Sequence, residues 1–229
     1  YSLAVLDEIL ARATAESAAL LLIAGDLFDT FQAAEALRGA VRERFDAFAG
    51  DAIYVPGNHE ELGRGRGALD RLDFGRLHLA RTTPFEYSVR EYQGLPIELL
   101  QIPHQSSYGD FREWAVPQRT AKLRIAVAHG IVSGLAYTGP DEEGDAAAID
   151  PSLFHTHYGD YAALGHIHAR RRETLNDCMF SYPGSARVWR SGETGPRGFI
   201  KLEIDPAVGN ASPEFVRLER AGEYRAVPA

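Results

Sequence analysis

Four short polar turns carry the residues of this chain that are best suited to chemistry. Each turn adjoins a brief apolar run, and in order they read Gly25-Asp26-Leu27-Phe28-Asp29, Gly57-Asn58-His59-Glu60, His129-Gly130 and Gly165-His166-Ile167-His168. Apolar runs of this length predict buried strands, and open α/β sheets collect their ligands at the carboxyl ends of such strands. We therefore expect the four turns to meet at one polar site.

The side chains of these turns form a donor set for divalent metals. First-row divalent ions accept imidazole nitrogen and carboxylate or amide oxygen, and a two-metal site needs a carboxylate that bridges both ions. Asp26 suits the bridge, and Asn58 offers a neutral oxygen. The candidate nitrogen ligands are His129, His166 and His168. The set contains no thiolate, which disfavours a structural zinc site.

The alternative is that these are separate turn and core residues. One aspartate after a strand also serves as a cap or closes a turn, so Asp26 alone is weak support. If the backbone around Ile167 is extended, however, His166 and His168 point the same way and reach two adjacent ions. Four such turns after four strands favour a metal site. Four other histidines match no motif turn and are expected to be structural: His78, His104, His155 and His157.

The segments around the first two turns have the periodicity of alternating helices and strands. Leu3, Leu6 and Leu10 recur at helical spacing after Ser2, a good N-cap. A second helix is predicted from Thr30 to about residue 48. The apolar runs on either side of it, 20–24 and 52–55, predict a right-handed crossover with parallel pairing. The doubly covered core of an α/β fold begins here.

The rest of the chain is richer in strands. Two short strand patterns separated by Gly94 predict a hairpin over residues 85–102. Buried strands are predicted at 124–128 and 161–164. The acidic, glycine-rich segment 139–145 predicts an exposed loop, followed by a short helix near 150–154. The C-terminal third is predicted to be largely antiparallel, with strands at 170–175, 179–182, 198–204 and 214–218.

Composition bounds the class of protein. A chain of 229 residues with 45% hydrophobic residues can bury a large core, so we expect one α/β domain. The lone cysteine, Cys178, excludes an internal disulfide and is typical of the cytoplasm. No apolar stretch approaches the ~20 residues that span a bilayer, so no membrane partner is expected. With a net charge of −8, contact with nucleic acid needs a local patch or help from a partner.

The four turns, in this order, resemble the signature motifs of the calcineurin-like metallophosphoesterases: GDxxD, GNH[ED], a His-Gly pair and GHxH. Within that superfamily the chain is most similar to the SbcD-type nuclease subunit of double-strand-break repair complexes. The narrower resemblance lies in GDLFD, in the block 160–168, and in Tyr182-Pro183-Gly184-Ser185 followed by Gly198-Phe199-Ile200. It implies a four-layer αββα sandwich of two mixed β-sheets flanked by helices.

The resemblance also implies a role for each candidate ligand. Asp26 would bridge two divalent ions, and His168 would belong to the second site. The first site would be completed by Asn58, His129 and His166. Mn²⁺ is the expected ion, with Fe²⁺, Zn²⁺ and Mg²⁺ as alternatives.

Two further residues of the turns are assigned to the reaction rather than to metal binding. His59, next to Asn58, is placed to stabilise the transferring phosphoryl group or to protonate the leaving oxygen. Asp29 is expected to orient a ligand. Bound ions lower the pKa of a water from ~16 toward ~7, which provides the nucleophile for hydrolysis of a phosphodiester.

The expected function is therefore that of a two-metal nuclease. DNA and an SbcC-type ATPase subunit are the implied partners, and a homodimer is also considered. Two alternatives stay open: a small-molecule phosphatase or phosphodiesterase with the same metals, and a non-catalytic scaffold with the same fold. Retention of His59 and of every ligand in the visible motifs argues against the scaffold.

The family's first strand carries a DxH motif, and no DxH precedes the first predicted helix here. We expect residues 1–229 to be a nuclease core domain without that strand and without the family's C-terminal capping domain. The second metal site then keeps only Asp26 and His168. Because two ligands hold a hard ion poorly, we expect residues 1–229 to bind at most about one metal tightly and to have little nuclease activity.

Overall fold

The computed structural model describes residues 2–61, 67–80, 85–104, 109–135, 148–189, 193–222 and 224. The described helices are α1 (Ser2–Ala15), α2 (Phe31–Ala47), α3 (Asn58–Glu61), α4 (Gly109–Glu113) and the 3₁₀ helices η1 (Ala68–Arg71) and η3 (Pro151–Leu153). The described strands are β1 (Leu20–Ala24), β2 (Asp51–Val55), β3 (Leu77–Leu79), β4 (Glu86–Tyr92), β5 (Leu95–Ile102), β6 (Leu123–His129), β7 (Ile131–Val132), β8 (Ala148–Ile149), β9 (Tyr161–Gly165), β10 (Arg171–Leu175), β11 (Cys178–Tyr182), β12 (Gly198–Ile204) and β13 (Ala211–Arg217). None of the described helices is long and apolar enough to cross a bilayer.

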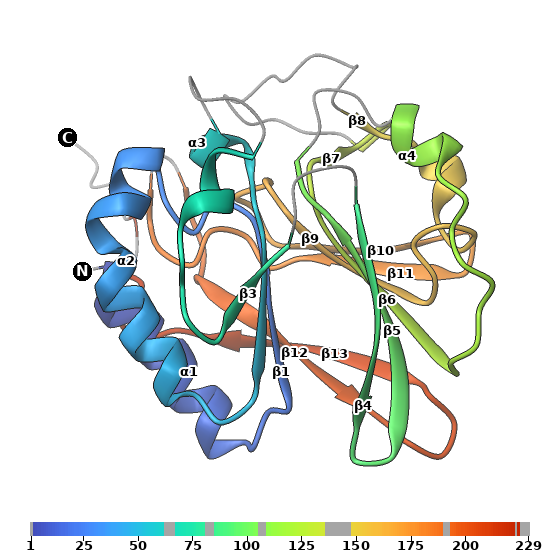
Figure 1. The fold of residues 1–229 in the computed structure, drawn as a ribbon, viewed down its shortest axis with the longest axis horizontal. Helices are drawn as coiled ribbons and strands as arrows, with labels where there is room; N and C mark the ends of the chain where they lie inside the picture. The colour runs from blue at the N-terminus through green and yellow to red at the C-terminus, as the bar shows by residue number, and fades with distance from the viewer. Residues whose placement is uncertain are drawn as a thin grey trace.

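Two sheets face each other in the described part of the chain (Figure 1). The smaller sheet has the order β1-β2-β3, and its described strands are all parallel. The larger sheet has the order β10-β11-β9-β6-β5-β4, with parallel pairs in the middle and an antiparallel hairpin at each edge. The parallel pairing of β1 and β2 across α2 confirms the predicted crossover. Among the described strands, mixed pairing is confined to the larger sheet.

Alternate residues of the central strands pack into different layers of the core. In β2, Tyr54 packs toward α1 and α2, whereas Val55 faces the larger sheet. In β6, Val127 belongs to the core between the sheets, and Ala128 packs on the far side with residues of α4 and η3. This period of two is the geometry of a strand buried on both faces. Three core clusters thus separate helix, sheet, sheet and helix, which confirms the αββα arrangement.

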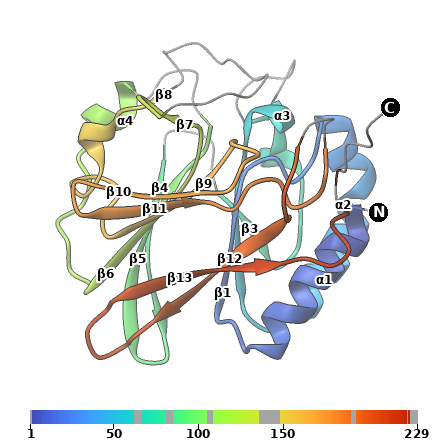
Figure 2. The ribbon, with the colours of Figure 1, turned by 180° about the vertical axis from the view of Figure 1, so that it is seen from behind.

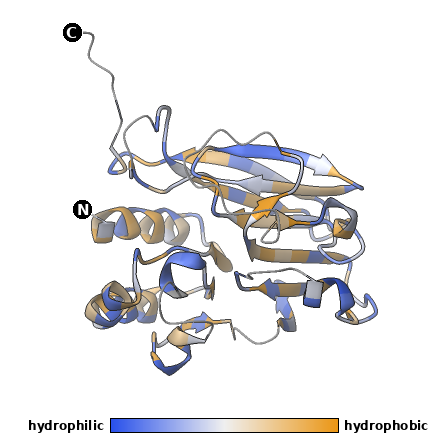
Figure 3. Cartoon of the chain, turned by 90° about the horizontal axis from the view of Figure 1, so that it is seen from above, coloured by the Kyte–Doolittle hydropathy of each residue, from blue (hydrophilic) through white to orange (hydrophobic). Residues whose placement is uncertain are grey.

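The hairpin β12–β13 closes one side of the two-sheet core (Figure 2). Its Leu202 and Ile204 pack into the core between the sheets. Just after β13, Leu218 packs against Val5 of α1. Helix α1 therefore has two apolar faces, because Leu6 on its other side packs toward the smaller sheet. Figure 3 shows hydrophobic and hydrophilic residues following one another along the helices and strands of the chain.

The helix and strand boundaries follow the local signals closely. The Thr30 hydroxyl accepts a hydrogen bond from the Ala33 N–H at 3.1 Å, as expected of the N-cap of α2. Ser2, predicted as the cap of the first helix, lies inside α1 instead. The predicted hairpin around Gly94 is confirmed. Strand β13 begins before the predicted residue 214 and includes Pro213, which a two-stranded ribbon tolerates. The loop predicted at 139–145 lies outside the described residues.

Candidate metal centre

The first two motif turns are joined by a buried carboxylate. Glu60 accepts hydrogen bonds from the backbone N–H groups of Asp26 at 3.3 Å, Phe28 at 3.1 Å and Gly57 at 3.0 Å. The hydroxyl of Tyr54 also donates to it. Burial, together with the nearby charge of Asp26, raises the pKa of Glu60 to about 7. Glu60 therefore holds the GDLFD turn against the GNHE turn.

Two motif glycines allow these turns to approach one another. A Cβ on Gly165 would lie 1.6 Å from the carbonyl oxygen of Ala24, and a Cβ on Gly57 would lie 2.2 Å from Asp26 Oδ1. Either distance is far below van der Waals contact. The glycines of GNHE and GHIH are therefore required by packing between the turns.

The side chains of four predicted ligands meet between these turns. His129 Nε2 lies 2.9 Å from Asn58 Oδ1 and 3.4 Å from Asp26 Oδ2. His166 Nδ1 lies 3.3 Å from Asn58 Oδ1 and 3.1 Å from His129 Nε2. Ligand atoms of Asp26, His129 and His166 all lie within 4.8 Å of one another. The structure thus brings Asp26, Asn58, His129 and His166 into one cluster, as the strand-end argument predicted.

The proton positions in this cluster fit a cation. His129 Nδ1 lies 2.9 Å from the carbonyl oxygen of Ala24, which can only accept, so the hydrogen of the neutral ring is on Nδ1. Burial lowers the pKa of His129 to about 4, so the ring is neutral at pH 7. Its Nε2 then presents a lone pair toward Asn58 Oδ1 and Asp26 Oδ2, which are acceptors too. Three acceptors that face one buried point suit a divalent ion.

Backbone conformation aims two of these side chains. Asp26 and His166 adopt φ angles of 51° and 98°, in a region that non-glycine residues rarely visit. Such positions persist where the surrounding structure holds them, and they gather at functional sites. Burial also raises the pKa of Asp26, against the opposing charge of His59. A half-buried carboxylate of this kind is stabilised in its charged form by a bound cation.

His168 lies beside the cluster but makes a different contact. Its Nδ1 lies 2.6 Å from Oε1 of Glu193, a residue that no motif indicated. His168 is not part of the group of Asp26, His129 and His166 whose ligand atoms lie within 4.8 Å of one another. Burial opposes ionisation of Glu193, but hydrogen bonds from the Trp189 N–H and from His168 hold its pKa below the ordinary value.

His59 lies at the half-buried rim of the cluster. Its backbone N–H donates to Asp26 Oδ1 at 3.2 Å, and its Nδ1 lies 3.4 Å from the carbonyl oxygen of Asp29. The carboxylate of Asp29 lies 3.4 Å from Nη2 of Arg187, whose guanidinium stacks over Trp189. The role of Asp29 in orienting a ligand therefore stays a prediction, and its described contacts are with Arg187 and, through its backbone, with His59.

Sequence reasoning missed three residues that contact the site. Glu60 stands in the GNHE motif, so a signal for it was present although no role was assigned. His104 was expected to be structural, yet its ring lies edge-on to that of His129 with centroids 5.9 Å apart. Glu193 lies 25 residues beyond His168, and nothing in its local pattern marks it.

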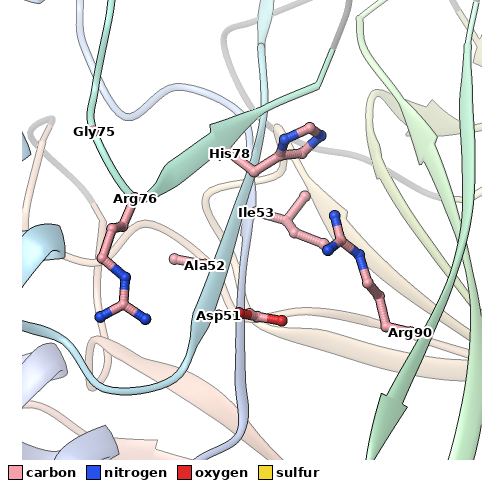
Figure 4. A pocket seen from close by; sticks show the side chains of 7 residues that line it. All are labelled: Asp51, Ala52, Ile53, Gly75, Arg76, His78 and Arg90. Carbon is pink, nitrogen blue, oxygen red and sulfur yellow. The ribbon is translucent and has the colours of Figure 1, made fainter.

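A cavity of about 260 Å³ lies away from this cluster, at the amino end of β2 (Figure 4). Its lining residues are Asp51, Ala52, Ile53, Gly75, Arg76, His78 and Arg90. None of the predicted ligands lines it. His78 pairs with Glu86 at 2.7 Å and Asp51 accepts from the Tyr92 hydroxyl at 2.9 Å, so both contacts link the smaller sheet to β4. We therefore assign the cavity no part in the metal centre.

Comparison with known proteins places the motif turns in a family. The calcineurin-like phosphoesterase family matches residues 1–170, a span that holds all the predicted site residues. The DNA double-strand break repair protein Mre11 of Methanopyrus kandleri is 29% identical over 234 residues, which cover 91% of this chain and 50% of that protein. The uncharacterized metallophosphoesterase YhaO of Bacillus subtilis is 27% identical over 218 residues, with coverage of 90% and 50%.

The chain spans about half the length of these curated relatives. Among solved structures, GAP50, the anchor in the inner membrane complex of Plasmodium, has a TM-score of 0.53 at 12% identity, over 95% of this chain and 80% of that chain. That likeness shows a shared fold. The family match over most of the chain shows more: this protein belongs to the calcineurin-like phosphoesterase family.

Proposed function

We propose that the chain is a Mn²⁺-dependent phosphodiesterase that acts on DNA as a nuclease of the SbcD type. The observation that carries the proposal is the convergence of Asp26, His129 and His166, whose ligand atoms lie within 4.8 Å of one another. Asn58 Oδ1 joins them at 2.9 Å from His129 Nε2. Phosphoester hydrolysis follows from the family, and DNA is the further step.

In this proposal Asp26, Asn58, His129 and His166 hold one ion, and His168 contributes with Asp26 to a second. When bound, the ions would polarise the phosphodiester and make a water acidic enough to attack at neutral pH. The donation from His129 Nδ1 to Ala24 keeps Nε2 free of its hydrogen, so this ring binds without first losing a proton.

His59 is proposed to handle the proton of the leaving group. Its Nδ1 faces the carbonyl oxygen of Asp29 at 3.4 Å, which leaves Nε2 to face the substrate. Its backbone N–H is held by Asp26 at 3.2 Å, so the ring is kept beside the bridging carboxylate. A positioned group of this kind contributes about 10²–10⁴ in rate.

Two observations favour DNA over a small phosphodiester. The relative from Methanopyrus kandleri is a DNA double-strand break repair protein. In this chain, Arg187 stacks over Trp189 with 4.2 Å between guanidinium and ring centroid, close to Asp29. A guanidinium suits a phosphate of the DNA backbone. The net charge of −8 supports a partner that supplies further DNA-binding surface, and we propose an SbcC-type ATPase in the cytoplasm, with a homodimer as the candidate assembly.

The test compares linear DNA with a chromogenic phosphodiester in the presence of Mn²⁺. It uses the full-length protein, because residues 1–229 by themselves are expected to have little nuclease activity. Hydrolysis of DNA, together with a DNA-binding constant that falls steeply with salt concentration, supports the assignment as a nuclease. Hydrolysis of the chromogenic ester alone would identify a small-molecule phosphodiesterase, and metal binding without hydrolysis of either would identify a scaffold. Asp26→Asn is the negative control, because asparagine tolerates the positive φ of this position but lacks the charge of the ligand.

A further inference from the structure

Glu193 is held beside His168 by a set of contacts that leaves its carboxylate little freedom. Oε1 lies 2.6 Å from His168 Nδ1. Oε2 accepts from the Trp189 N–H at 2.8 Å and from the Ser185 hydroxyl at 3.3 Å. The side chain of Glu193 is only 11% exposed. A carboxylate bound at both oxygens is a fixed acceptor for the imidazole.

Arg197 holds the backbone of His168 in the same arrangement. Its Nη1 donates to the His168 carbonyl oxygen at 2.8 Å and to the Ser185 hydroxyl at 3.0 Å, and its Nη2 lies 3.9 Å from Glu193 Oε2. The Arg197 side chain is buried. Both the backbone and the ring of His168 are therefore held by one group of residues from the segment after β11, in which Arg197 is buried.

This contact decides which nitrogen of His168 is available. A neutral imidazole whose Nδ1 donates to a carboxylate carries its lone pair on Nε2. His168 follows two residues after His166, whose Nδ1 lies 3.1 Å from His129 Nε2 in the cluster. Histidine ligands of metals are commonly oriented by a carboxylate on their other nitrogen.

We propose that Glu193 is the positioning residue that holds His168 with Nε2 directed at a divalent ion. The inference rests on the proposed function, since His168 is a predicted ligand there. Glu193 touches neither the substrate nor the ion, and it acts through the imidazole. The residue lies outside the part of the chain that the family matches, residues 1–170.

The chain contains a matched pair for comparison. His78 Nε2 lies 2.7 Å from Glu86 Oε1, a contact of the same chemistry between β3 and β4, with the His78 side chain 39% exposed. Neither residue touches a predicted ligand in the described contacts. Glu86→Gln therefore measures what the loss of an equivalent carboxylate–imidazole contact does to the fold alone.

The first measurement is made on the unsubstituted protein without metal. The ring nitrogen chemical shifts of His168 by NMR report its tautomer, and we expect hydrogen on Nδ1. Hydrogen on Nε2 alone would overturn the proposal, whatever the variants do. This readout does not depend on activity or on the folding of a variant.

The second measurement titrates Mn²⁺ alone into the protein, Glu193→Gln and Glu86→Gln, and follows paramagnetic broadening of each histidine ring. For Glu193→Gln we expect the Mn²⁺ concentration that half-broadens His168 to rise about 10–100-fold, with His129 little changed. Glu86→Gln should leave the half-broadening concentrations of both His168 and His129 unchanged. If the same Mn²⁺ concentration half-broadens His168 in Glu193→Gln and in the unsubstituted protein, the proposal is overturned.

Ser185→Ala covers the case in which Glu193→Gln does not fold. It removes one hydrogen bond to Glu193, so we expect the Mn²⁺ concentration that half-broadens His168 to rise, but by less than in Glu193→Gln. An unchanged concentration would count against the proposal. The failure of the two ideas can be told apart. If DNA is not hydrolysed but His168 behaves as described, the proposed function fails and the positioning role stands. If DNA is hydrolysed and Glu193→Gln binds Mn²⁺ normally at His168, only the positioning role fails.

Discussion

The hydrogen positions on three histidines decide what the site can do. His129 donates from Nδ1 to Ala24, His168 lies with Nδ1 on Glu193, and His59 lies with Nδ1 near the Asp29 carbonyl. In each case the partner of Nδ1 is an oxygen acceptor, so Nε2 is the nitrogen left for a ligand or a proton. Three acceptors from different parts of the fold thus select one tautomer.

In the full-length protein, His59→Ala should separate catalysis from metal binding. We expect Mn²⁺ affinity to stay within about threefold and the hydrolysis rate to fall by about 10²–10⁴, because the ring is assigned to proton transfer and not to ligation. Calorimetry with Mn²⁺ and turnover of DNA measure the two quantities. Loss of Mn²⁺ binding as large as in Asp26→Asn, or unchanged turnover, would contradict the assignment.

At the scale of elements, the site depends on how closely the ends of β1, β6 and β9 approach. His129 at the end of β6 reaches across to Ala24, 105 residues earlier in the chain. Gly165 at the end of β9 leaves room for the same carbonyl group. The turns therefore form one packed unit, and Glu60 ties the turn after β2 to it.

Gly165→Ala should break this unit. Its Cβ would lie 1.6 Å from the Ala24 oxygen and 3.0 Å from His129 Nδ1, so β9 must move and His129 loses its alignment. We expect Mn²⁺ affinity to fall and stability to drop by about 1–3 kcal/mol, as for other overpacked sites. Gly39→Ala is the control. Nothing lies within 4 Å of a Cβ at Gly39 in α2, so that change should stabilise by about 0.5–1 kcal/mol.

A buried ion pair joins β5 to β6. Arg124 Nε donates to Glu98 Oε2 at 2.6 Å across directly paired positions, and both side chains are almost fully buried. Burial opposes ionisation of Glu98, but hydrogen bonds from Thr120 and Arg124 outweigh it and lower the pKa to about 2. Since this pKa is depressed in the folded state, the stabilisation is present above the ordinary pKa of 4.5 and is lost as the pH falls toward 2.

Glu98→Gln should lower the free energy of unfolding by about 3–5 kcal/mol at pH 7, because it leaves the Arg124 charge buried without its partner. The difference from the unsubstituted protein should shrink as the pH falls from 5 to 3. Urea unfolding over this range measures both. Glu91→Gln on the exposed side of β4 should change stability by less than about 0.5 kcal/mol. A difference for Glu98→Gln that is small, or that does not depend on pH, would contradict this account.

On the scale of the whole molecule, three apolar clusters hold the four layers together. The cluster beyond the larger sheet contains aromatic residues of α4, of β11 and of the segment after η3, such as Phe111, Phe154 and Phe180. Cys178 lies fully buried in this cluster. Its reactivity therefore reports opening of the larger sheet.

Cys178 should be inert in the native protein. Burial raises the pKa of the thiol to about 12, and the chain has one cysteine, so a thiol reagent has a single target. We expect labelling at neutral pH to be at least about 10³-fold slower than for the unfolded chain, since a domain of ordinary stability is unfolded less than about 10⁻³ of the time. Labelling in denaturant sets the reference rate. Fast labelling of the native protein would show that the larger sheet opens locally.

Local patterns in the sequence predict the strand ends and the polar residues that gather there, whereas the layered fold was implied by the resemblance to a family. The local patterns are short apolar runs, a helix capped at Thr30, and polar turns directly after Ala24, Val55 and Leu164. Parallel strands deliver their carboxyl ends to one edge of a sheet, so the turns had to converge whatever their exact contacts.

The contacts that hold those polar side chains could not be predicted from local patterns. Three contacts join residues whose spacing in the sequence has no periodic pattern. Glu60 binds backbone groups of two turns, Ala24 sets the tautomer of His129, and Glu193 contacts His168. Such contacts depend on which strands are neighbours and on where a later loop returns. Hydrophobic periodicity reports which face of an element is buried, but not which polar group lies opposite, and for that reason these partners appear only in the folded chain.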